Sequence, residues 1–322
     1  MAAVFATPLA QSSHSEVLEW RFPDTRHTSF IIPQLNLLLD AGLCVNKQRP
    51  KHIFITHGHT DHCLLTPAFI KRSDPPDIYC PVEVAKVLND FLRAKTVLNA
   101  GGLRTADDTD KSDAESVDDF EPSEDPQPAT CPTIPAERHW LDTHDLYGVR
   151  PGDVVPLRRT VDWTAEAFAC DHQVPCVGYV FKMNSKKLKK EYTGLKGVEL
   201  KNLRESGVEI TASHATPVFA FLGDTTAATL AAEPQWLKDE IPVIITECSF
   251  LYEEHRAQAV KTKHTIWADL EPVVRKWPKT TFILMHFSLR YSDKDIRRFF
   301  ADMLDPPANI VVWVDGHPES GD

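Results

Sequence analysis

Seven residues from Thr56 to His62, reading Thr-His-Gly-His-Thr-Asp-His, constrain this chain more than any other stretch. They follow the apolar run His52–Ile55 and place four side chains that can bind metal within six residues. Imidazoles and carboxylates crowded at a strand end repel one another when charged and are costly to bury without partners. A divalent metal removes both costs, because it binds neutral imidazole nitrogens and ionised carboxylate oxygens. The run therefore predicts a metal site at the end of a buried strand.

The spacing within this run predicts two metal positions. Alternate residues of an extended chain point to the same side. His57 and His59 are therefore expected to share one ion, while Asp61 and His62 turn toward a second.

Four other short apolar runs also end in residues that bind metal or move protons. Each is too short for a typical helix and is expected to form a buried strand. The residues at their ends are Asp40, Asp224, Glu247 and His286. If these strands run side by side in one direction, their ends meet at one rim, where an α/β fold carries its catalytic cleft.

Composition is ordinary for a globular protein, at 42% hydrophobic and 25% charged residues over 322 positions, and this length allows one large domain or two modest ones. We expect a single domain over 1–322. No apolar stretch is long enough to cross a bilayer, and the first twenty residues lack the features of a secretory signal. The seven cysteines are scattered and form no CxxC pair. These features favour a reduced compartment, the cytoplasm or the nucleus, and no membrane partner.

The net charge of −11 is concentrated in one segment, where ten acidic residues and one lysine lie between Asp107 and Asp125. With the prolines that follow, this composition cannot bury enough apolar surface to order itself. We expect a disordered acidic insertion over about 104–136, with the remainder of the chain close to neutral.

A second charged segment, 182–206, contains eight basic residues against three glutamates. A solvated helix or hairpin explains it adequately. The alternative is an arm that follows the phosphates of a nucleic acid, because clustered lysines release counterions from a polyanion. The residues expected to contact RNA are Lys186, Lys187, Lys189, Lys190 and Lys196.

The pattern of elements is rich in strands in the first half and alternates strands with helices in the second. Helices are expected near 82–97, 265–276 and 293–304, and strands near 207–211 and 217–223, among others. This order predicts two mixed sheets with helices on their outer faces, an αβ fold.

The order of the HxHxDH run, His172, Asp224 and His286 resembles the metallo-β-lactamase superfamily. Within it, the chain is similar to the short form of tRNase Z (ribonuclease Z), and especially to plant-like members. Further matching stretches are 188–195, 207–211, Gly223–Thr226 and His286–Tyr291. The resemblance implies a four-layer αββα sandwich.

Position by position, the resemblance implies two zinc ions, although other divalent metals could serve. One would bind His57, His59 and His172, and the other Asp61, His62 and His286. Asp224 would bridge the two.

The resemblance also implies the reaction, in which a metal-activated water attacks the phosphorus on the 3′ side of the discriminator base of precursor tRNA. Asp61 is then both ligand and catalytic residue. His264 would protonate the leaving 3′-oxygen, and Glu247 would orient and charge His264.

Several motifs depart from the family pattern. Leu64-Leu65 replaces a Gly-Gly pair, Thr246–Ser249 replaces His-Glu-Ala-Thr, and Pro23–His27 is only an echo of the Pro-x-Lys-x-Arg-Asn loop. The family's Gly-Pro-rich arm is absent, and the shorter basic segment takes its place. That arm acts across a homodimer, so the resemblance implies a homodimer here.

Two other functions are compatible with these residues. A small-molecule phosphodiesterase of the same superfamily would use the metal ligands but would need neither the basic segment nor His264. An RNA-binding protein with a vestigial metal site would be expected to have lost ligands, whereas all seven positions match. A precursor tRNA carrying a 3′ extension is the substrate that separates these alternatives.

Overall fold

The computed structural model describes residues 3–8, 17–22, 28–43, 49–71, 74–99, 134–135 and 143–314, with backbone alone for 3–8, 17–22 and 134–135. The segment Pro23–His27 lies outside the described residues. So does the predicted acidic insertion at 104–136, except for Ile134–Pro135, which form a short strand.

In the described part of the chain, the first sheet has eight strands in the order β1-β2-β3-β4-β5-β6-β8-β7. The central strands β4, β5, β6 and β8 run parallel, and the other neighbours pair antiparallel. The bounds are β1 (Ala3–Pro8), β2 (Val17–Phe22), β3 (Phe30–Ile32), β4 (Leu37–Leu39), β5 (His52–Phe54), β6 (Asp77–Pro81), β7 (Ile134–Pro135) and β8 (Asp145–Val149).

The second sheet has seven strands among the described residues, in the order β15-β14-β13-β12-β11-β10-β9. Strands β12 to β15 are parallel, and β9 to β12 are antiparallel. The bounds are β9 (Val154–Pro156), β10 (Trp163–Ala169), β11 (Val177–Leu188), β12 (Thr211–Phe221), β13 (Val243–Glu247), β14 (Thr281–Met285) and β15 (Ile310–Val312).

The two sheets pack face to face around an aromatic core. Phe54 of β5 meets Tyr179 and Phe181 of β11, with ring centroids 4.8 and 5.1 Å apart. Strands in this core are buried on both faces, which explains why they read as continuous apolar runs. The inner core thus fixes how the rims of the two sheets face each other.

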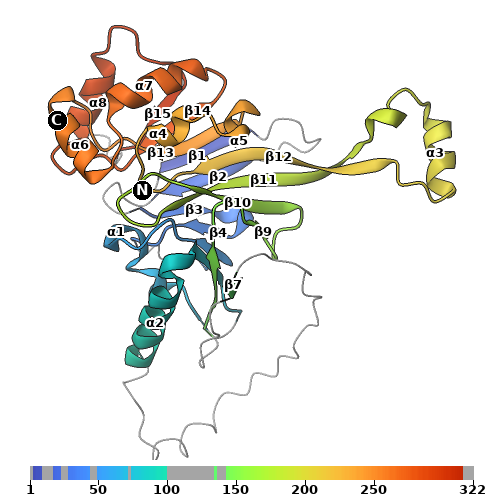
Figure 1. The fold of residues 1–322 in the computed structure, drawn as a ribbon, viewed down its shortest axis with the longest axis horizontal. Coiled ribbons are helices and arrows are strands. Elements are labelled where there is room, and N and C mark those ends of the chain that lie inside the picture. The colour runs from blue at the N-terminus through green and yellow to red at the C-terminus, as the bar shows by residue number, and fades with distance from the viewer. Residues whose placement is uncertain are drawn as a thin grey trace, which may run out of the picture.

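Helices cover the outer faces of both sheets (Figure 1). On α2 (Val82–Asn99), Ala85, Leu88 and Leu92 form one buried face against the first sheet. The second sheet is covered by α4 (Ala228–Ala231), α5 (Gln235–Lys238), α7 (Trp267–Lys276) and α8 (Asp293–Ala301). The predicted four-layer αββα sandwich is confirmed.

The basic segment forms an arm that projects from the body of the protein (Figure 1). Strands β11 and β12 pair antiparallel from Tyr179↔Phe221 to Leu188↔Thr211, and α3 (Gly197–Glu205) lies at the tip. The prediction of two strands near 207–211 and 217–223 is wrong, because β12 is one strand over Thr211–Phe221. Its outer half is exposed and its inner half is buried, so only the inner half carries the apolar signal of a strand.

None of the helices in the described part of the chain has the length and apolarity needed to cross a bilayer.

Candidate metal centre

The Thr56–His62 turn connects β5 to a short helix, α1 (Thr60–Cys63), at the carboxyl end of the first sheet. His57 and His59 flank Gly58 in extended chain, and His57 Nε2 lies 3.0 Å from His59 Nδ1. Asp61 and His62 follow on α1, where the helical turn redirects them. The local geometry matches the expected division of this run into two pairs.

In the described part of the chain, three groups of potential ligands result, and within each group the ligand atoms lie within 4.8 Å of one another. Residues from the second sheet contribute to every group, because His172 follows β10, Asp224 follows β12 and His286 follows β14. The first group is His57, His59, His172 and Asp224; the second is Asp61, His62 and His286; a third, Asp224, His264 and His286, overlaps both. All seven side chains expected from the sequence are therefore brought together.

Four of the five histidines in the first two ligand groups have Nδ1 in contact with a neighbouring residue and direct Nε2 toward the other ligands. His57 Nδ1 contacts Thr56 Oγ1 at 3.0 Å, and His62 Nδ1 contacts Asp40 Oδ2 at 2.8 Å. His172 Nδ1 lies 3.1 Å from the backbone O of Lys263, and His286 Nδ1 lies 3.3 Å from Ser249 Oγ. Such contacts are typical of histidines that bind metal, because they fix the ring and its tautomer. His59 differs, since its Nδ1 faces the group.

Asp40 is buried beneath the turn and does not join any of these groups of ligands. Besides holding His62, its carboxylate accepts hydrogen bonds from the Thr56 backbone N at 2.7 Å and from Thr56 Oγ1 at 2.9 Å. The Thr56 hydroxyl can then accept from His57 Nδ1–H. The strand-end residue Asp40 therefore orients two of the histidines.

Asp224 lies between the first two groups and is almost completely buried. Its Oδ2 is 3.6 Å from His57 Nε2, and its Oδ1 is 3.3 Å from His62 Nε2 and 3.6 Å from His286 Nδ1. Burial alone would raise the pKa of Asp224, but the charges of His286 and His62 hold it well below its usual range. This ionised carboxylate therefore contacts histidines of both ligand groups.

The donor set fits a divalent cation. Asp224 Oδ1 is buried without a hydrogen-bond partner, which is costly unless a cation meets it. Burial is the main reason that the pKa of His57 falls to about 2, and the charge of His62 lowers it further. Near neutral pH the imidazole of His57 is therefore neutral and has a free lone pair. Neutral imidazoles and ionised carboxylates are the ligands that zinc takes.

Glu247 and His264 form a hydrogen-bonded pair beside the candidate metal ligands. Glu247 is fully buried, and its Oε1 lies 2.8 Å from His264 Nδ1. Its carboxylate also accepts hydrogen bonds from Thr225 N at 2.7 Å and Thr265 N at 3.1 Å. Burial would lower the pKa of His264, but the charge and hydrogen bond of Glu247 outweigh it and raise the pKa to about 9. His264 is therefore a histidine held in its protonated form.

A cleft of about 260 Å³ opens beside this pair. Metal-centre residues line one side, and the other side is formed by residues such as Phe250, Gln258 and Leu289. His264 and His286 stack across this region with ring centroids 5.7 Å apart. A substrate in this cleft would reach both the metal ligands and the protonated histidine.

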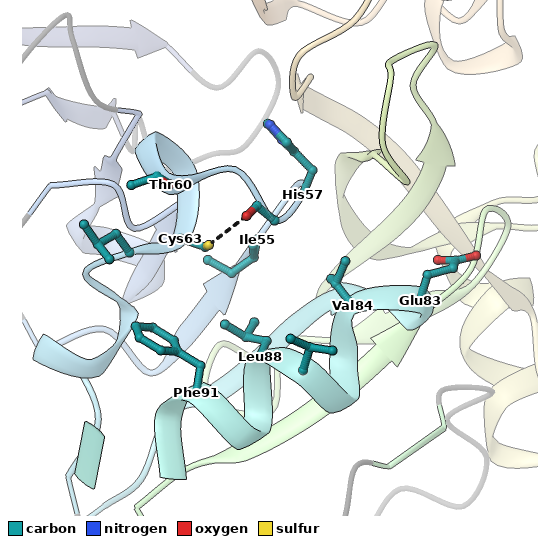
Figure 2. A pocket seen from close by; sticks show the side chains of 11 residues that line it. Ile55, His57, Thr60, Cys63, Glu83, Val84, Leu88 and Phe91 are labelled. Atoms are coloured by element: carbon teal, nitrogen blue, oxygen red, sulfur yellow. Dashed lines mark hydrogen bonds between the residues drawn. The ribbon is translucent and has the colours of Figure 1, made fainter. Parts of the chain in front are cut away.

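A second cavity of about 350 Å³ lies on the other side of the turn, against α2 (Figure 2). It is lined mainly by apolar side chains, among them Ile55, Val84, Leu88 and Phe91. Figure 2 shows the His57 ring pointing away from it. This cavity is not where the ligand groups converge.

The lysines expected to contact RNA lie on the arm, away from the metal centre (Figure 1). Lys186, Lys187, Lys190 and Lys196 are exposed, and Lys189 is half-buried. The contacts of Thr56, Ser249 and the Lys263 carbonyl with histidines of the site were not predicted from the sequence. Hydroxyls and backbone carbonyls at these positions carry no sequence signal that marks them as partners of histidines.

The fold and the donor set define a divalent metal site in a protein of the metallo-β-lactamase class. The family model described as the metallo-beta-lactamase superfamily matches residues 36–136. The chain is 27% identical to tRNase Z TRZ1 of Arabidopsis thaliana over 293 residues, which cover 89% of this chain and 90% of the relative. It is 30% identical to the nuclear ribonuclease Z of Triticum aestivum over 190 residues, covering 57% of this chain and 85% of the relative.

The chain belongs to the tRNase Z (ribonuclease Z) family, and the resemblance drawn from its motifs, including that to plant members, is confirmed. Among solved structures, human tRNase Z, short form, is 16% identical, with a TM-score of 0.45 and coverage of 82% of this chain and 87% of that chain.

Proposed function

We propose that this protein is an endoribonuclease that removes the 3′ trailer from precursor tRNA by hydrolysing a phosphodiester bond near the discriminator base. Relatives over most of the chain are named tRNase Z or ribonuclease Z. The observation that carries the proposal is the Glu247–His264 pair beside the first two ligand groups. A phosphodiester with a good leaving group, such as bis-p-nitrophenyl phosphate, needs only the metal site for hydrolysis. The 3′-alkoxide that leaves from RNA is a poor leaving group and also needs a proton donor.

Two zinc ions per chain are the metals that this ligand set would hold, and other divalent metals could replace them. His57, His59 and His172 would bind one ion, and the second would bind Asp61, His62 and His286, with Asp224 between them. When bound, such ions supply an activated water and stabilise negative charge on the phosphate. The neutral state of His57 and the unpartnered Oδ1 of Asp224 support this assignment.

His264 would donate its proton to the 3′-oxygen of the nucleotide upstream of the cut. Its position in the open cleft and its hydrogen bond to Glu247 support this role. The carboxylate of Glu247 would accept a hydrogen bond from His264 Nδ1–H. This leaves the Nε2–H of His264 free to reach the substrate. Asp61, half-exposed at the cleft, would contact the metal and the reacting phosphate.

The arm would bind the body of the tRNA through Lys186, Lys187, Lys189, Lys190 and Lys196. Exposed lysines on an extended pair of strands can follow a phosphate backbone without fixing a base sequence. Because the tip lies away from its own metal centre (Figure 1), a homodimer would let each arm hold the tRNA that its partner cuts. The scattered cysteines, which are free thiols in the described part of the chain, fit a cytoplasmic or nuclear protein.

A precursor tRNA with a 3′ extension tests this proposal. The zinc-loaded protein is expected to release the trailer, to stop when the metals are chelated, and to resume when zinc is restored. Asp61→Ala is the matched inactive variant, because its partly exposed side chain can be shortened without opening the core. Hydrolysis of bis-p-nitrophenyl phosphate without any cleavage of precursor tRNA would instead identify a small-molecule phosphodiesterase.

A further inference from the structure

We propose that Ser249 is a positioning residue that couples the Glu247–His264 pair to the metal ligand His286. The role of His264 as proton donor rests on the proposed function. Ser249 follows β13 and its side chain is buried, with 4% of its surface exposed. Its Oγ lies 2.6 Å from Glu247 Oε2 and 3.3 Å from His286 Nδ1. One hydroxyl therefore touches both parts of the site.

The direction of these hydrogen bonds follows from the number of protons. A serine hydroxyl has one proton and two acceptor lone pairs, and an ionised carboxylate can only accept. Ser249 therefore donates to Glu247 Oε2 and shares that proton with the backbone O of His286, 2.9 Å away. The lone pairs of Oγ stay available, and one of them can accept from His286 Nδ1–H.

This arrangement selects the tautomer of His286. When the ring is neutral and its proton is on Nδ1, Nε2 carries a free lone pair, and it faces Asp61 Oδ2 at 3.2 Å and His62 Nε2 at 3.4 Å. Those are the other members of its ligand group. The Ser249 hydroxyl thus makes the inward nitrogen of His286 the one that can bind metal.

Ser249 also supports the backbone of His286. That residue has a φ of +56°, a left-handed conformation that is unfavourable for a residue with a side chain. The Ser249 hydroxyl contacts its carbonyl, and the Ser249 backbone O accepts from Ser288 N at 3.0 Å. Ser249 therefore contacts both the ring and the backbone of His286.

Removal of the hydroxyl should affect His286 far more than His264. Ser249 Oγ also lies 3.4 Å from His264 Nδ1, but that nitrogen has a shorter contact of 2.8 Å with Glu247 Oε1. Without Ser249 Oγ, Glu247 keeps its hydrogen bonds from Thr225 N, Thr265 N and His264 Nδ1. His286 Nδ1 keeps the more distant Asp224 Oδ1, at 3.6 Å. The change should therefore weaken the second ligand group and spare the first.

The experiment compares Ser249→Ala, Ser249→Thr and Thr246→Val with the parent. Thr246→Val is the matched control, because the Thr246 hydroxyl is buried in β13, the strand that precedes Ser249, and has no hydrogen-bond partner. Zinc affinity is measured by competition with a chromogenic chelator, which requires no RNA. Thermal melting reports folding, and kcat and KM are measured on both precursor tRNA and bis-p-nitrophenyl phosphate.

Ser249→Ala is expected to release one of two zinc ions at about 10- to 100-fold lower chelator concentration, with the second ion held as in the parent. Its kcat should fall on both substrates while KM for precursor tRNA changes little, since the arm is untouched. Ser249→Thr should restore zinc affinity, and Thr246→Val should match the parent throughout.

Parent-like zinc affinity in a folded Ser249→Ala variant would overturn the inference. Equal losses in Ser249→Ala and Thr246→Val would also overturn it, because strand packing and not the hydroxyl would then be responsible. If the parent binds zinc but does not cut precursor tRNA, the proposed function fails, while the zinc comparison still decides the role of Ser249.

Discussion

Asp40 holds His62 by a contact of 2.8 Å between Oδ2 and Nδ1, and both side chains are completely buried. Asp40 reaches a second histidine, His57, through the Thr56 hydroxyl. Each of these histidines belongs to a different ligand group. One buried carboxylate in the first sheet therefore orients histidines of both ligand groups.

Glu247 has the equivalent position in the second sheet. It holds His264 directly, and it reaches His286 through the Ser249 hydroxyl. The metal centre is thus supported from both sheets by the same device, a buried carboxylate with a hydroxyl beside it.

Asp40→Asn should lower zinc affinity by about 10- to 100-fold, because the charge that orients and strengthens His62 as a ligand is lost. Chelator competition measures this change. Asp239→Asn, at an exposed position after α5, is the matched control and should behave as the parent. Unchanged zinc affinity in Asp40→Asn would show that this contact does not support the metal centre.

His264→Ala should slow cleavage of precursor tRNA by roughly 10²- to 10⁴-fold, the usual contribution of a general acid. Zinc content should stay at the parent level, because the histidine is held by Glu247 and is not assigned as a ligand. Single-turnover kinetics and metal analysis of the same preparation check both expectations. Loss of zinc from this variant would mean that His264 is a ligand.

We expect the arm to contribute to tRNA binding and not to the hydrolytic step. Changing Lys186, Lys187, Lys189 and Lys190 together to glutamine should weaken precursor tRNA binding and flatten its dependence on salt, because fewer counterions are released. Hydrolysis of bis-p-nitrophenyl phosphate should hardly change.

A control variant for the arm carries four changes at exposed lysines of the helical layer, Lys238, Lys276, Lys279 and Lys294, with the same change in net charge. It should bind precursor tRNA as the parent does. If both variants weaken binding equally, net charge and not the arm is responsible.

His52 should make the stability of the protein sensitive to acid. It is fully buried, and burial is the main reason that its pKa falls from 6.5 to about 4. The unfolded chain therefore binds a proton at a higher pH than the folded chain does. The stability that His52 contributes is complete above pH 6.5 and is lost as the pH falls toward 4.

Between pH 7.5 and 4.5 this loss amounts to about 2 to 3 kcal/mol of unfolding free energy. Urea unfolding with chelator present, so that metal release does not contribute, measures it in the parent and in His52→Gln. The variant should lose that much less stability over the same interval. Equal losses in the two proteins would show that His52 is not the responsible group.

Much of the candidate metal centre could be predicted from the sequence, because most of its expected ligands lie in one short run or close after buried strands, while His172 was identified through the family resemblance. Short apolar runs mark the buried strands, so the ends of these strands, where the expected ligands lie, can be located in the sequence. Ser249 and the Lys263 carbonyl could not be predicted, since their roles depend on distances between segments far apart in the chain. The full length of β12 was missed because its outer half is polar and exposed on the arm.

The most direct test of the account is to map the products of a 3′-extended precursor tRNA after incubation with the zinc-loaded protein. The account predicts one cut next to the discriminator base, with a 3′-hydroxyl on the tRNA and a 5′-phosphate on the trailer. That outcome requires water attack on the phosphorus and protonation of the leaving 3′-oxygen, the role proposed for His264. A 2′,3′-cyclic phosphate on the tRNA, or an intact precursor in the presence of zinc, would contradict it.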